Sequence, residues 1–190
     1  MTKSILLIGV GGQGTILISK ILSAGFAEMG YDVKMSEIHG MSQRGGSVTT
    51  MIRYGDEVYS PNFGTAEADV VISFEKSEVI RALPQLKKGG TVISDTYEIY
   101  SVPVLTGAST YPFDALDQVS AAIPNTLVIE AFKGAEQLGN SRCQNIVLLG
   151  KLVKTMKLDE KVDWRALVAA NVPPKTVDVN LKAYDLGYSM

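Results

Sequence analysis

Short, almost continuously apolar runs recur along the chain between turn residues. The first is residues 4–10 (SILLIGV), and runs of the same kind are residues 69–74, 91–94 and 126–130. Such a run is typical of a strand that is covered on both faces, as in a parallel sheet. The pattern therefore predicts four parallel strands.

Helical periodicity of apolar residues fills most of the intervals between these runs and dominates the chain from residue 141 onward. The predicted helices are residues 15–29, 75–83, 114–122, 145–156, 162–170 and 175–187. The alternating segment 32–37 and the segment 47–54, which is rich in β-branched residues, predict two further strands. Residues 97–112 are expected to be strand fragments and loop.

Glycine-containing turns set two further expectations. Gly55 and Asp56 supply a turn, so residues 57–60 are expected to return as the second strand of an antiparallel hairpin. Gly89 and Gly90 are expected to break the chain before the strand that follows them.

Strands that alternate with helices predict an α/β fold. We expect a Rossmann-like, mostly parallel sheet flanked by helices, with an antiparallel hairpin and a helical C-terminal end. The length suits one domain, so residues 1–190 are expected to form a single unit.

Composition and charge exclude several classes of function. With 18 basic and 20 acidic side chains the net charge is -2, so neither nucleic acid nor an anionic membrane is an expected partner. No run of 18 apolar residues predicts a membrane span. Cys143 is the only cysteine, and one thiol cannot build a disulfide within the chain, a CxxC zinc site or a four-cysteine iron–sulfur site. This cysteine usage favours a cytoplasmic protein.

A glycine-rich loop follows the first predicted strand and precedes the first predicted helix. It has the G-x-G-x-x-G pattern, in which the glycines allow a tight turn, a close approach of the backbone to a ligand and close packing of the helix. The start of the helix favours a phosphate or another anion, and Glu37 at the end of the second strand is a candidate to hold a ribose. A purely structural turn remains the alternative.

A second loop, residues 38–46, follows the second predicted strand. In an open parallel sheet ligands gather outside the carboxyl ends of the strands, so this loop is expected beside the glycine loop if the two strands are neighbours. Arg44, with Gly45 and Gly46 after it, could clamp a phosphate or carboxylate, or could simply pair with an acidic residue. His39 is the only histidine of the chain, and a structural role is more common for such a residue than catalysis.

The chain lacks the motifs of a self-sufficient enzyme. It contains no G-x-S-x-G, no G-x-x-x-x-G-K-[ST], no H-E-x-x-H and no clustered cysteine and histidine ligands. Glu75, Lys76 and Asp95 follow predicted strands, which places them at the same edge of the sheet, although the first two could equally be a solvated helix start.

Three stretches of the chain together resemble one protein family. GVGGQG at residues 9–14, EIHGMSQRGGSV at 37–48 and NVPPKTVDVNLKAYDLG at 171–187 resemble the gamma subunit or domain of 2-oxoacid:ferredoxin oxidoreductases (the pyruvate/ketoisovalerate oxidoreductase gamma family). Within that family the chain is most similar to the small (beta) subunits of indolepyruvate:ferredoxin oxidoreductases. The likeness covers residues 3–187.

The resemblance implies a role inside a larger enzyme. Such a complex oxidatively decarboxylates a 2-oxo acid to an acyl-CoA and passes the electrons to ferredoxin. Thiamine diphosphate, magnesium and iron–sulfur clusters are then expected in the partner subunit. This chain is expected to hold no cofactor tightly, to contact coenzyme A or the partner, and to be inactive alone. The thiamine-binding signature of GDG with a downstream asparagine is absent, since Gly55 and Asp56 are followed by Glu57 instead of a glycine.

The resemblance also implies which residues form the cofactor-binding or partner-binding surface, without assigning a catalytic residue or a metal ligand. They are Gly9, Gly11, Gly12, Gln13 and Gly14 in the first motif, and Glu37, His39, Gly40, Met41, Ser42, Gln43, Arg44, Gly45 and Gly46 in the second. Two alternatives stay open, an independent NAD(P)- or FAD-binding oxidoreductase and an assembly module without a ligand. A homodimer of the isolated chain also stays open.

Overall fold

The computed structural model describes residues 2–39 and 46–190, and it places a six-stranded sheet at the centre of the protein. The order of the strands across the sheet is β2-β3-β1-β4-β5-β6. Their bounds are β1 Lys3–Val10, β2 Asp32–His39, β3 Ser47–Gly55, β4 Ala68–Ser73, β5 Leu86–Asp95 and β6 Thr126–Ile129. Strands β1, β4, β5 and β6 pair in parallel, and β3 pairs antiparallel with both β1 and β2. The prediction of a mostly parallel α/β sheet is confirmed.

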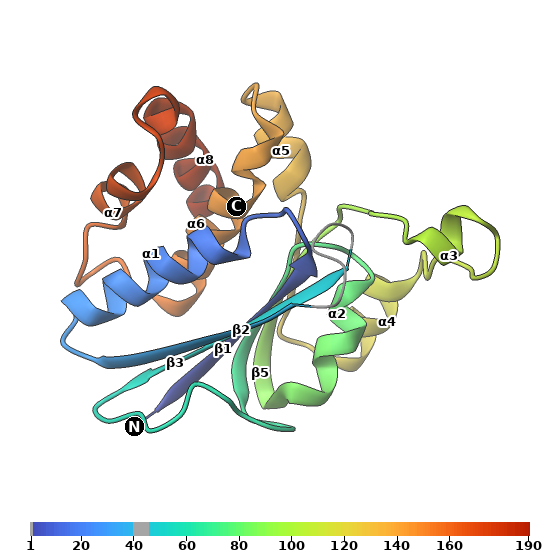
Figure 1. Cartoon of the computed structure of the whole chain (residues 1–190), viewed down its shortest axis with the longest axis horizontal. Helices are drawn as coiled ribbons and strands as arrows, with labels where there is room; N and C mark the ends of the chain where they lie inside the picture. The colour runs from blue at the N-terminus through green and yellow to red at the C-terminus, as the bar shows by residue number, and fades with distance from the viewer. Residues whose placement is uncertain (1, 40–45) are drawn as a thin grey trace.

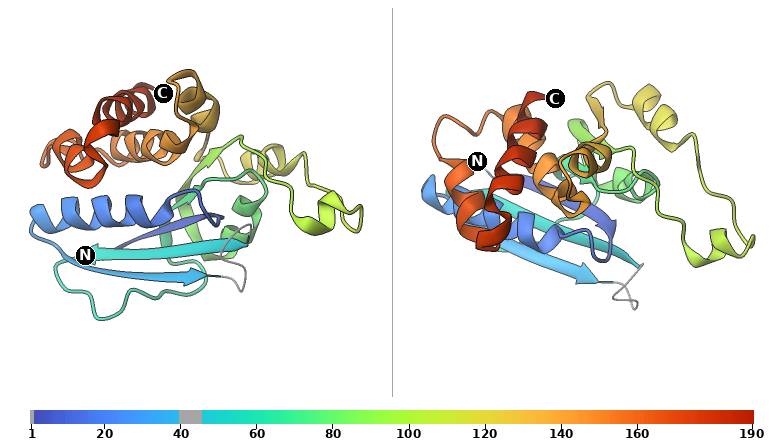
Figure 2. Two further views of the ribbon diagram at one scale, coloured as in Figure 1. Left: turned by 45° about the horizontal axis from the view of Figure 1, so that its top comes forward. Right: turned by 90° about the horizontal axis from the view of Figure 1, so that it is seen from above.

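Helices cover both faces of the sheet (Figure 1). One face carries α1 (Thr15–Glu28), with α5 (Ala131–Gln137), α6 (Gln144–Met156), α7 (Trp164–Asn171) and α8 (Val177–Ser189) packed over it and beside it. The other face carries α2 (Glu78–Ala82) and α4 (Ala115–Ala122). Figure 2 shows the C-terminal helices stacked as a further layer over α1, away from the sheet.

Each face of β1 enters a different part of the core. Ile5 and Leu7 pack with the helices of the α1 face, whereas Leu6 and Ile8 pack with those of the α2 face. The alternation of a strand sends successive side chains to opposite faces. A strand that is buried on both faces needs apolar residues at almost every position, which explains the composition of the segment SILLIGV.

Three short 3-10 turns complete the described secondary structure, at Leu83–Gln85, Ser141–Cys143 and Pro174–Thr176. The short helix α3 (Val102–Leu105) lies in a segment that projects from the body of the molecule, at the right of Figure 1.

The antiparallel hairpin is present, but the prediction of its second strand was wrong. Residues 57–60 are not a strand, and β3 pairs instead with β2, which precedes it. The β-branched residues of the segment 47–54 identified β3 itself, whereas the choice of its partner depended on the turn at Gly55 and Asp56. β3 lies between β2 and β1, where both of its edges are hydrogen-bonded.

Other element boundaries also differ from those expected. Gly89 and Gly90 lie inside β5 rather than before it. Residues 97–112 contain α3 and no strand, and the helix predicted at 75–83 begins only at Glu78. The helix α5 was not predicted, because its sequence AFKGAEQ is short and carries a central glycine.

The antiparallel strand β3 has one consequence for function. Because β1 and β2 are both antiparallel to β3, their carboxyl ends lie at the same edge of the sheet although the two strands are not neighbours. The start of β3 lies there too, since Ser47 pairs with Val10 and Val48 pairs with His39. We call this edge, with the loops that follow β1, β4, β5 and β6, the carboxyl rim.

Within residues 2–39 and 46–190 the helices are either too short or too polar to cross a lipid bilayer.

Candidate functional site

The glycine loop and the segment before β3 meet at the carboxyl rim. The backbone N–H of Gly11 donates a hydrogen bond of 2.9 Å to the carbonyl of Gly46. Gly9 lies in β1 and is opposite Val48 of β3. The second glycine of the pair in the second motif is therefore held against the first motif, on one edge of the sheet.

Part of the second motif cannot be placed. Gly40, Met41, Ser42, Gln43, Arg44 and Gly45 lie outside the described residues, as does the side chain of His39. The assignments made for these residues from the sequence stay predictions.

Two glycines of the loop are required by packing. A Cβ atom on Gly9 would lie 2.7 Å from Gln13 Oε1 and 2.9 Å from the Cβ of Phe74. Gly14 has a φ of +80°, and a Cβ there would lie 2.3 Å from Asn145 Nδ2. Gly12, with a φ of +105°, has open space around the position of a Cβ. Gly9 and Gly14 thus serve close packing, while Gly12 supplies a backbone conformation that other residues adopt at a cost.

The side chain of Gln13 points inward rather than toward a ligand. Its Oε1 accepts from the N–H of Val10 at 2.7 Å, and its Nε2 donates to the carbonyl of Phe74 at 2.8 Å and to Gln144 Oε1 at 3.2 Å. These bonds join the loop after β1 to the loop after β4 and to the start of α6. Gln13 therefore fixes the shape of the glycine loop from the side that faces the protein interior.

Gln144 extends this polar network to Asp95 at the end of β5. Its Nε2 donates to Asp95 Oδ2 at 2.7 Å and to the carbonyl of Phe74 at 2.7 Å. Asp95 is fully buried and also accepts from the N–H groups of Ala131 and Phe132 at the start of α5. Burial raises the pKa of Asp95, although the hydrogen bond from Gln144 and the backbone donors oppose that effect.

The strand order creates a crevice between β1 and β4. The chain leaves β1 toward β2 on one side, and it leaves β4 toward β5 on the other. Such a reversal is where α/β sheets commonly bind ligands, outside the carboxyl ends of the strands. A cavity of about 550 Å³ opens there. Its lining, which we call the rim cleft, consists of Val10, Ser77, Glu78, Ile80, Arg81 and residues 99–104 and 109–112.

Glu75 anchors one wall of this cleft, since its side chain is fully buried and accepts hydrogen bonds on both oxygens. Oε2 accepts from the N–H and the hydroxyl of Ser77, each at 2.7 Å, and from the N–H of Glu78 at 2.9 Å. Oε1 accepts from the N–H of Ile99 at 3.1 Å and from the hydroxyl of Tyr111. One carboxylate thus holds the start of α2 and both ends of the segment between Ile99 and Tyr111.

Tyr111 remains a donor in this arrangement. Burial, followed by the hydrogen bond to Glu75, raises the pKa of its hydroxyl far above the ordinary value for tyrosine. The hydroxyl therefore stays protonated.

A second carboxylate connects α2 to β3. The side chain of Glu78 is largely buried, accepts from the Ser47 hydroxyl and lies 3.3 Å from Arg81 Nε. Ser47 directly follows Gly46, so this contact ties the end of the second motif to the helix that lines the rim cleft.

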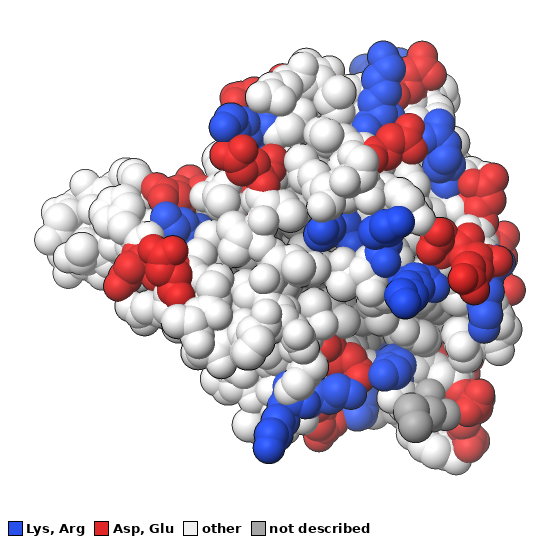
Figure 3. Space-filling view, turned by 180° about the vertical axis from the view of Figure 1, so that it is seen from behind, with Lys and Arg blue, Asp and Glu red and all other residues white. Residues whose placement is uncertain are grey.

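The segment that contains α3, residues 99–113, forms what we call the projecting arm. Its sequence, IYSVPVLTGASTYPF, contains no charged residue. Tyr100, Val102, Leu105 and Phe113 are exposed large apolar residues on it, with Val102 exposed by 72% and Leu105 by 68%. Figure 3 shows the tip of the arm, at the left of that view, free of charged side chains, whereas charges are scattered over the rest of that face. An uncharged, apolar projection of this kind is typical of a surface that contacts another protein.

Glu37 does not lie beside the glycine loop. It pairs with Thr50 of β3, and Thr50 pairs with Leu7 of β1, so Glu37 is two strands away from β1. At the usual spacing of strands this is a distance of about 10 Å. In a dinucleotide site the strand that carries the acidic residue adjoins the first strand. The insertion of β3 therefore disfavours the arrangement in which Glu37 holds a ribose.

The described residues do not form a metal centre. No group of three or more histidine, cysteine, aspartate or glutamate side chains among them is placed to hold a metal ion. Cys143 is buried, and burial raises the pKa of its thiol. The donor set of the described residues thus does not fit an iron–sulfur cluster.

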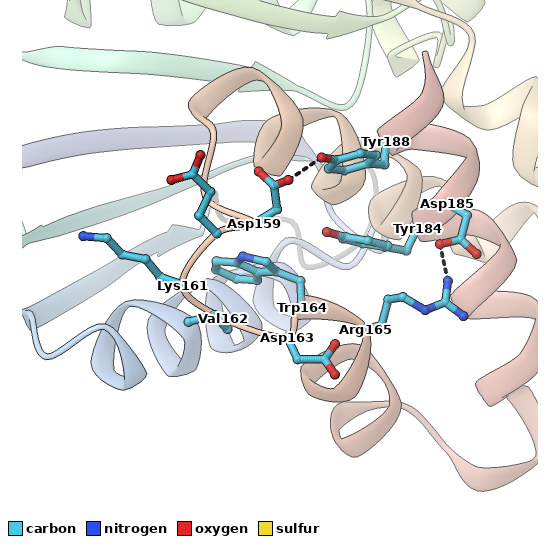
Figure 4. Close-up of a pocket in the computed structure, with 10 residues that line it drawn as sticks. Asp159, Lys161, Val162, Asp163, Trp164, Arg165, Tyr184, Asp185 and Tyr188 are labelled. Carbon is cyan, nitrogen blue, oxygen red and sulfur yellow. Dashed lines mark hydrogen bonds and ion pairs between the residues drawn. The ribbon is translucent and has the colours of Figure 1, made fainter.

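Another cavity, with a volume of about 640 Å³, lies between the C-terminal helices (Figure 4). In it Tyr188 donates to Asp159 at 2.5 Å, and Arg165 pairs with Asp185. The indole ring of Trp164 faces Gly25 near the end of α1, which is the end remote from the glycine loop. Those predicted site residues that the structure describes do not line this cavity.

The sequence predicted that Glu75 and Asp95 lie at the rim, but it did not predict their roles. Both were expected near the ends of strands, and both lie there. Their burial and their capping of α2 and α5 depend on contacts with Tyr111 and Gln144, which are distant along the chain. The rim cleft and the projecting arm were not predicted, although the long uncharged stretch at 99–113 was a usable signal.

Fold and site together define a Rossmann-like domain with a glycine loop, a cleft at the reversal of its strand order and no evident catalytic set of its own among the described residues. The family model described as pyruvate ferredoxin/flavodoxin oxidoreductase matches residues 4–190. The chain therefore belongs to this family, and the predicted family membership is confirmed.

Individual relatives agree with this assignment. The indolepyruvate oxidoreductase subunit IorB of Pyrococcus horikoshii is 38% identical over 190 residues, covering 97% of this chain and 93% of that protein. The gamma subunit of a keto/oxoacid ferredoxin oxidoreductase from Geobacter sulfurreducens has the same fold, with a TM-score of 0.72 at 21% identity over 98% of this chain and 96% of its own.

A larger protein contains a domain of the same fold. The 2-oxoglutarate:ferredoxin oxidoreductase of Magnetococcus marinus, solved with 2-oxoglutarate, coenzyme A and succinyl-CoA bound, aligns with a TM-score of 0.75 at 19% identity. The alignment covers 99% of this chain and 30% of that one.

Proposed function

We propose that this chain is the non-thiamine subunit of a 2-oxoacid:ferredoxin oxidoreductase of the indolepyruvate type. The enzyme would convert a 2-oxo acid and coenzyme A to an acyl-CoA and carbon dioxide, with two electrons passed to ferredoxin. The observation that carries the proposal is the match to one family along residues 4–190, with a relative named as an indolepyruvate oxidoreductase subunit that is matched over 93% of its length.

The reactive chemistry belongs to a partner subunit under this proposal. Thiamine diphosphate with magnesium would supply the carbanion chemistry of decarboxylation, and iron–sulfur clusters would carry the electrons. The donor set of this chain does not fit a cluster, since it has one cysteine and that residue is buried. The chain is therefore inactive alone, and its contribution is to bind and to orient.

The carboxyl rim is the surface through which this contribution is made. The glycine loop and the rim cleft lie together there, and the projecting arm extends from the cleft. We assign the arm to contact with the thiamine-binding subunit, because its exposed apolar residues carry no charge that must be desolvated. We assign the cleft to coenzyme A, which needs a cavity of several hundred cubic ångströms.

The experiment is anaerobic purification of the native chain with its associated proteins, followed by an assay for reduction of ferredoxin. Indolepyruvate, phenylpyruvate and pyruvate are compared, each with and without coenzyme A. The expected result is a thiamine-containing partner and activity that needs coenzyme A and is highest with the aryl pyruvates.

Two results would contradict the proposal. The first is a chain that purifies without an oxidoreductase partner and binds NAD(P) or FAD tightly, as an independent Rossmann enzyme would. The second is a complex that is highly active with pyruvate and inactive with both aryl pyruvates, which would refute the indolepyruvate assignment and leave the family role intact.

A further inference from the structure

A cavity of about 390 Å³ lies on the far side of the glycine loop from the rim cleft, where the beginnings of three helices meet. It is formed by the first turn of α1, the start of α6 with the 3-10 turn before it, and the start of α8 with the 3-10 turn before that helix. The lining residues are Leu17, Asn140, Arg142, Cys143, Asn145, Val172, Pro173, Lys175, Thr176 and Asn180. We call it the three-helix cavity.

The charge of this lining is entirely positive. Arg142 and Lys175 both line the cavity, and the described lining residues include no carboxylate. Neither cation forms an ion pair with another described residue. Both side chains are solvent-exposed, so two cations without a described ion-pair partner are available at this one cavity.

Two buried amide side chains face the same space. Asn145 is 4% exposed and Asn180 is 6% exposed, and both line the cavity. The Nδ2 of Asn145 donates to the carbonyl of Gly14 at 3.3 Å, and the Nδ2 of Asn180 donates to the carbonyl of Thr176 at 2.8 Å. Each amide nitrogen carries two hydrogens, and the described residues accept only one from each. A donor from each buried side chain is thus left for a ligand.

The helices add to the positive potential. The N-terminus of an α-helix carries a partial positive charge and unpaired N–H groups. The helices α1, α6 and α8 have 14, 13 and 13 residues, and the cavity is lined from the first turn or cap of each. The thiol of Cys143 adds no negative charge, because burial raises its pKa.

We propose that the three-helix cavity is a binding site for a phosphate-bearing ligand, held by Arg142, Lys175 and the amides of Asn145 and Asn180. Phosphate oxygens are strong acceptors that match charged and amide donors. The cavity is large enough for a phosphate or diphosphate group with part of the molecule attached to it. The proposal does not rest on the oxidoreductase role, since it concerns the chain alone.

The test is isothermal titration of the full-length chain with inorganic pyrophosphate. The double variant Arg142→Gln with Lys175→Gln is compared with a matched variant, Lys88→Gln with Lys182→Gln, which removes two exposed lysines outside the cavity. The native chain and the matched variant are expected to bind alike. The double variant is expected to bind at least about tenfold more weakly, because charge-assisted hydrogen bonds are lost. Thermal unfolding without pyrophosphate checks that both variants fold.

Three results would overturn the proposal: no binding by the native chain, equal binding by the double variant, or equal weakening in both variants. Competition then identifies the source of the phosphate. Displacement of pyrophosphate by coenzyme A but not by dephospho-coenzyme A supports the site with the 3′-phosphate of coenzyme A as its ligand, and it would contradict the assignment of coenzyme A to the rim cleft. Displacement by ADP and both coenzymes alike supports it with a diphosphate as the ligand.

Discussion

A few buried polar side chains determine the geometry of the carboxyl rim. Glu75 gathers donors from α2 and from both ends of the projecting arm, and Asp95 caps α5. Gln13 and Gln144 connect the glycine loop to Asp95 and to the carbonyl of Phe74, the residue before Glu75. A buried carboxylate is costly unless its hydrogen bonds are satisfied, so each of these residues depends on the others.

Glu75→Gln is the most direct test of the anchoring role at the scale of one residue. Glutamine has the same shape, but its amide nitrogen would face a donor and leave that donor unpaired. We expect the free energy of unfolding to fall by about 2–4 kcal/mol, measured by chemical denaturation. The control is Glu98→Gln, which removes a partly exposed pair with Lys76 and should cost about 1 kcal/mol or less. Equal losses in the two variants would refute a special role for Glu75.

The pKa of Asp69 leads to a prediction of how the stability of the protein depends on pH. Burial raises its pKa, but hydrogen bonds from Lys87, the N–H of Ser4 and Lys3 outweigh burial and hold the pKa below the ordinary value of 3.8. The folded protein therefore binds this proton less readily than the unfolded chain does. The stabilisation is complete above the unfolded pKa and is lost as the pH falls through the folded pKa.

Asp69→Asn should accordingly flatten the decline in stability at acid pH, and the native chain should exceed it in stability most clearly near neutral pH. Denaturation midpoints between pH 2 and pH 7 measure this. The control Asp117→Asn removes an exposed carboxylate on α4 and should leave the acid decline unchanged. An unchanged profile in Asp69→Asn would count against the assignment.

At the scale of elements, the sequence predicts which segments form strands, but it does not predict the pairing between strands that are distant along the chain. All six strands were expected close to where they lie, because apolar runs and alternation report burial of the strand itself. The insertion of β3 between β1 and β2 was not predicted, since strand pairing depends on residues such as Leu7 and Thr50 that are far apart along the chain. The break expected at Gly89 and Gly90 was wrong for a similar reason, because Gly90 packs against the backbone carbonyl of Asp69 in the neighbouring strand β4, where a Cβ would lie 3.1 Å from that oxygen.

The crossing of α6 and α8 shows how a small residue sets the distance between two helices. A Cβ on Gly187 would lie 1.8 Å from the backbone carbonyl oxygen of Val147, so the helices would have to move apart. We expect Gly187→Ala to lower the free energy of unfolding by about 3 kcal/mol or more, measured by chemical denaturation. Gly64→Ala is the control, since its Cβ would meet only Glu67 Oε1 at 3.8 Å, and should change stability by about 0.5 kcal/mol or less. Similar effects in both variants would contradict the close crossing.

At the scale of the whole molecule, the two ends of the sheet differ in character. The carboxyl rim carries the glycine loop, the rim cleft and the uncharged projecting arm. The loop after β3 lies at the opposite edge, because the end of β3 pairs with the start of β1. Of the residues predicted for the site, those of the first motif and Gly46 are placed at the rim, whereas the prediction for Arg44 and its neighbours stays a prediction.

Leu105→Glu tests whether the arm contacts the partner subunit. Leu105 is 68% exposed, so the substitution should leave the stability of the chain within about 0.5 kcal/mol of its native value. Burying the new carboxylate at an interface should weaken assembly by at least about tenfold, measured by co-purification and by titration of the partner. Tyr59→Glu is the control, an exposed position on the loop after β3, and should assemble normally. Normal assembly of Leu105→Glu would contradict the assignment of the projecting arm to the interface with the partner subunit.

The measurement that bears most directly on the proposed role is reconstitution of the thiamine-binding subunit with and without this chain. Reduction of ferredoxin by indolepyruvate and coenzyme A is followed anaerobically as the chain is added. We expect negligible turnover for either protein alone and activity that rises with added chain until the two are at a fixed ratio. Full activity of the thiamine-binding subunit without the chain would contradict it.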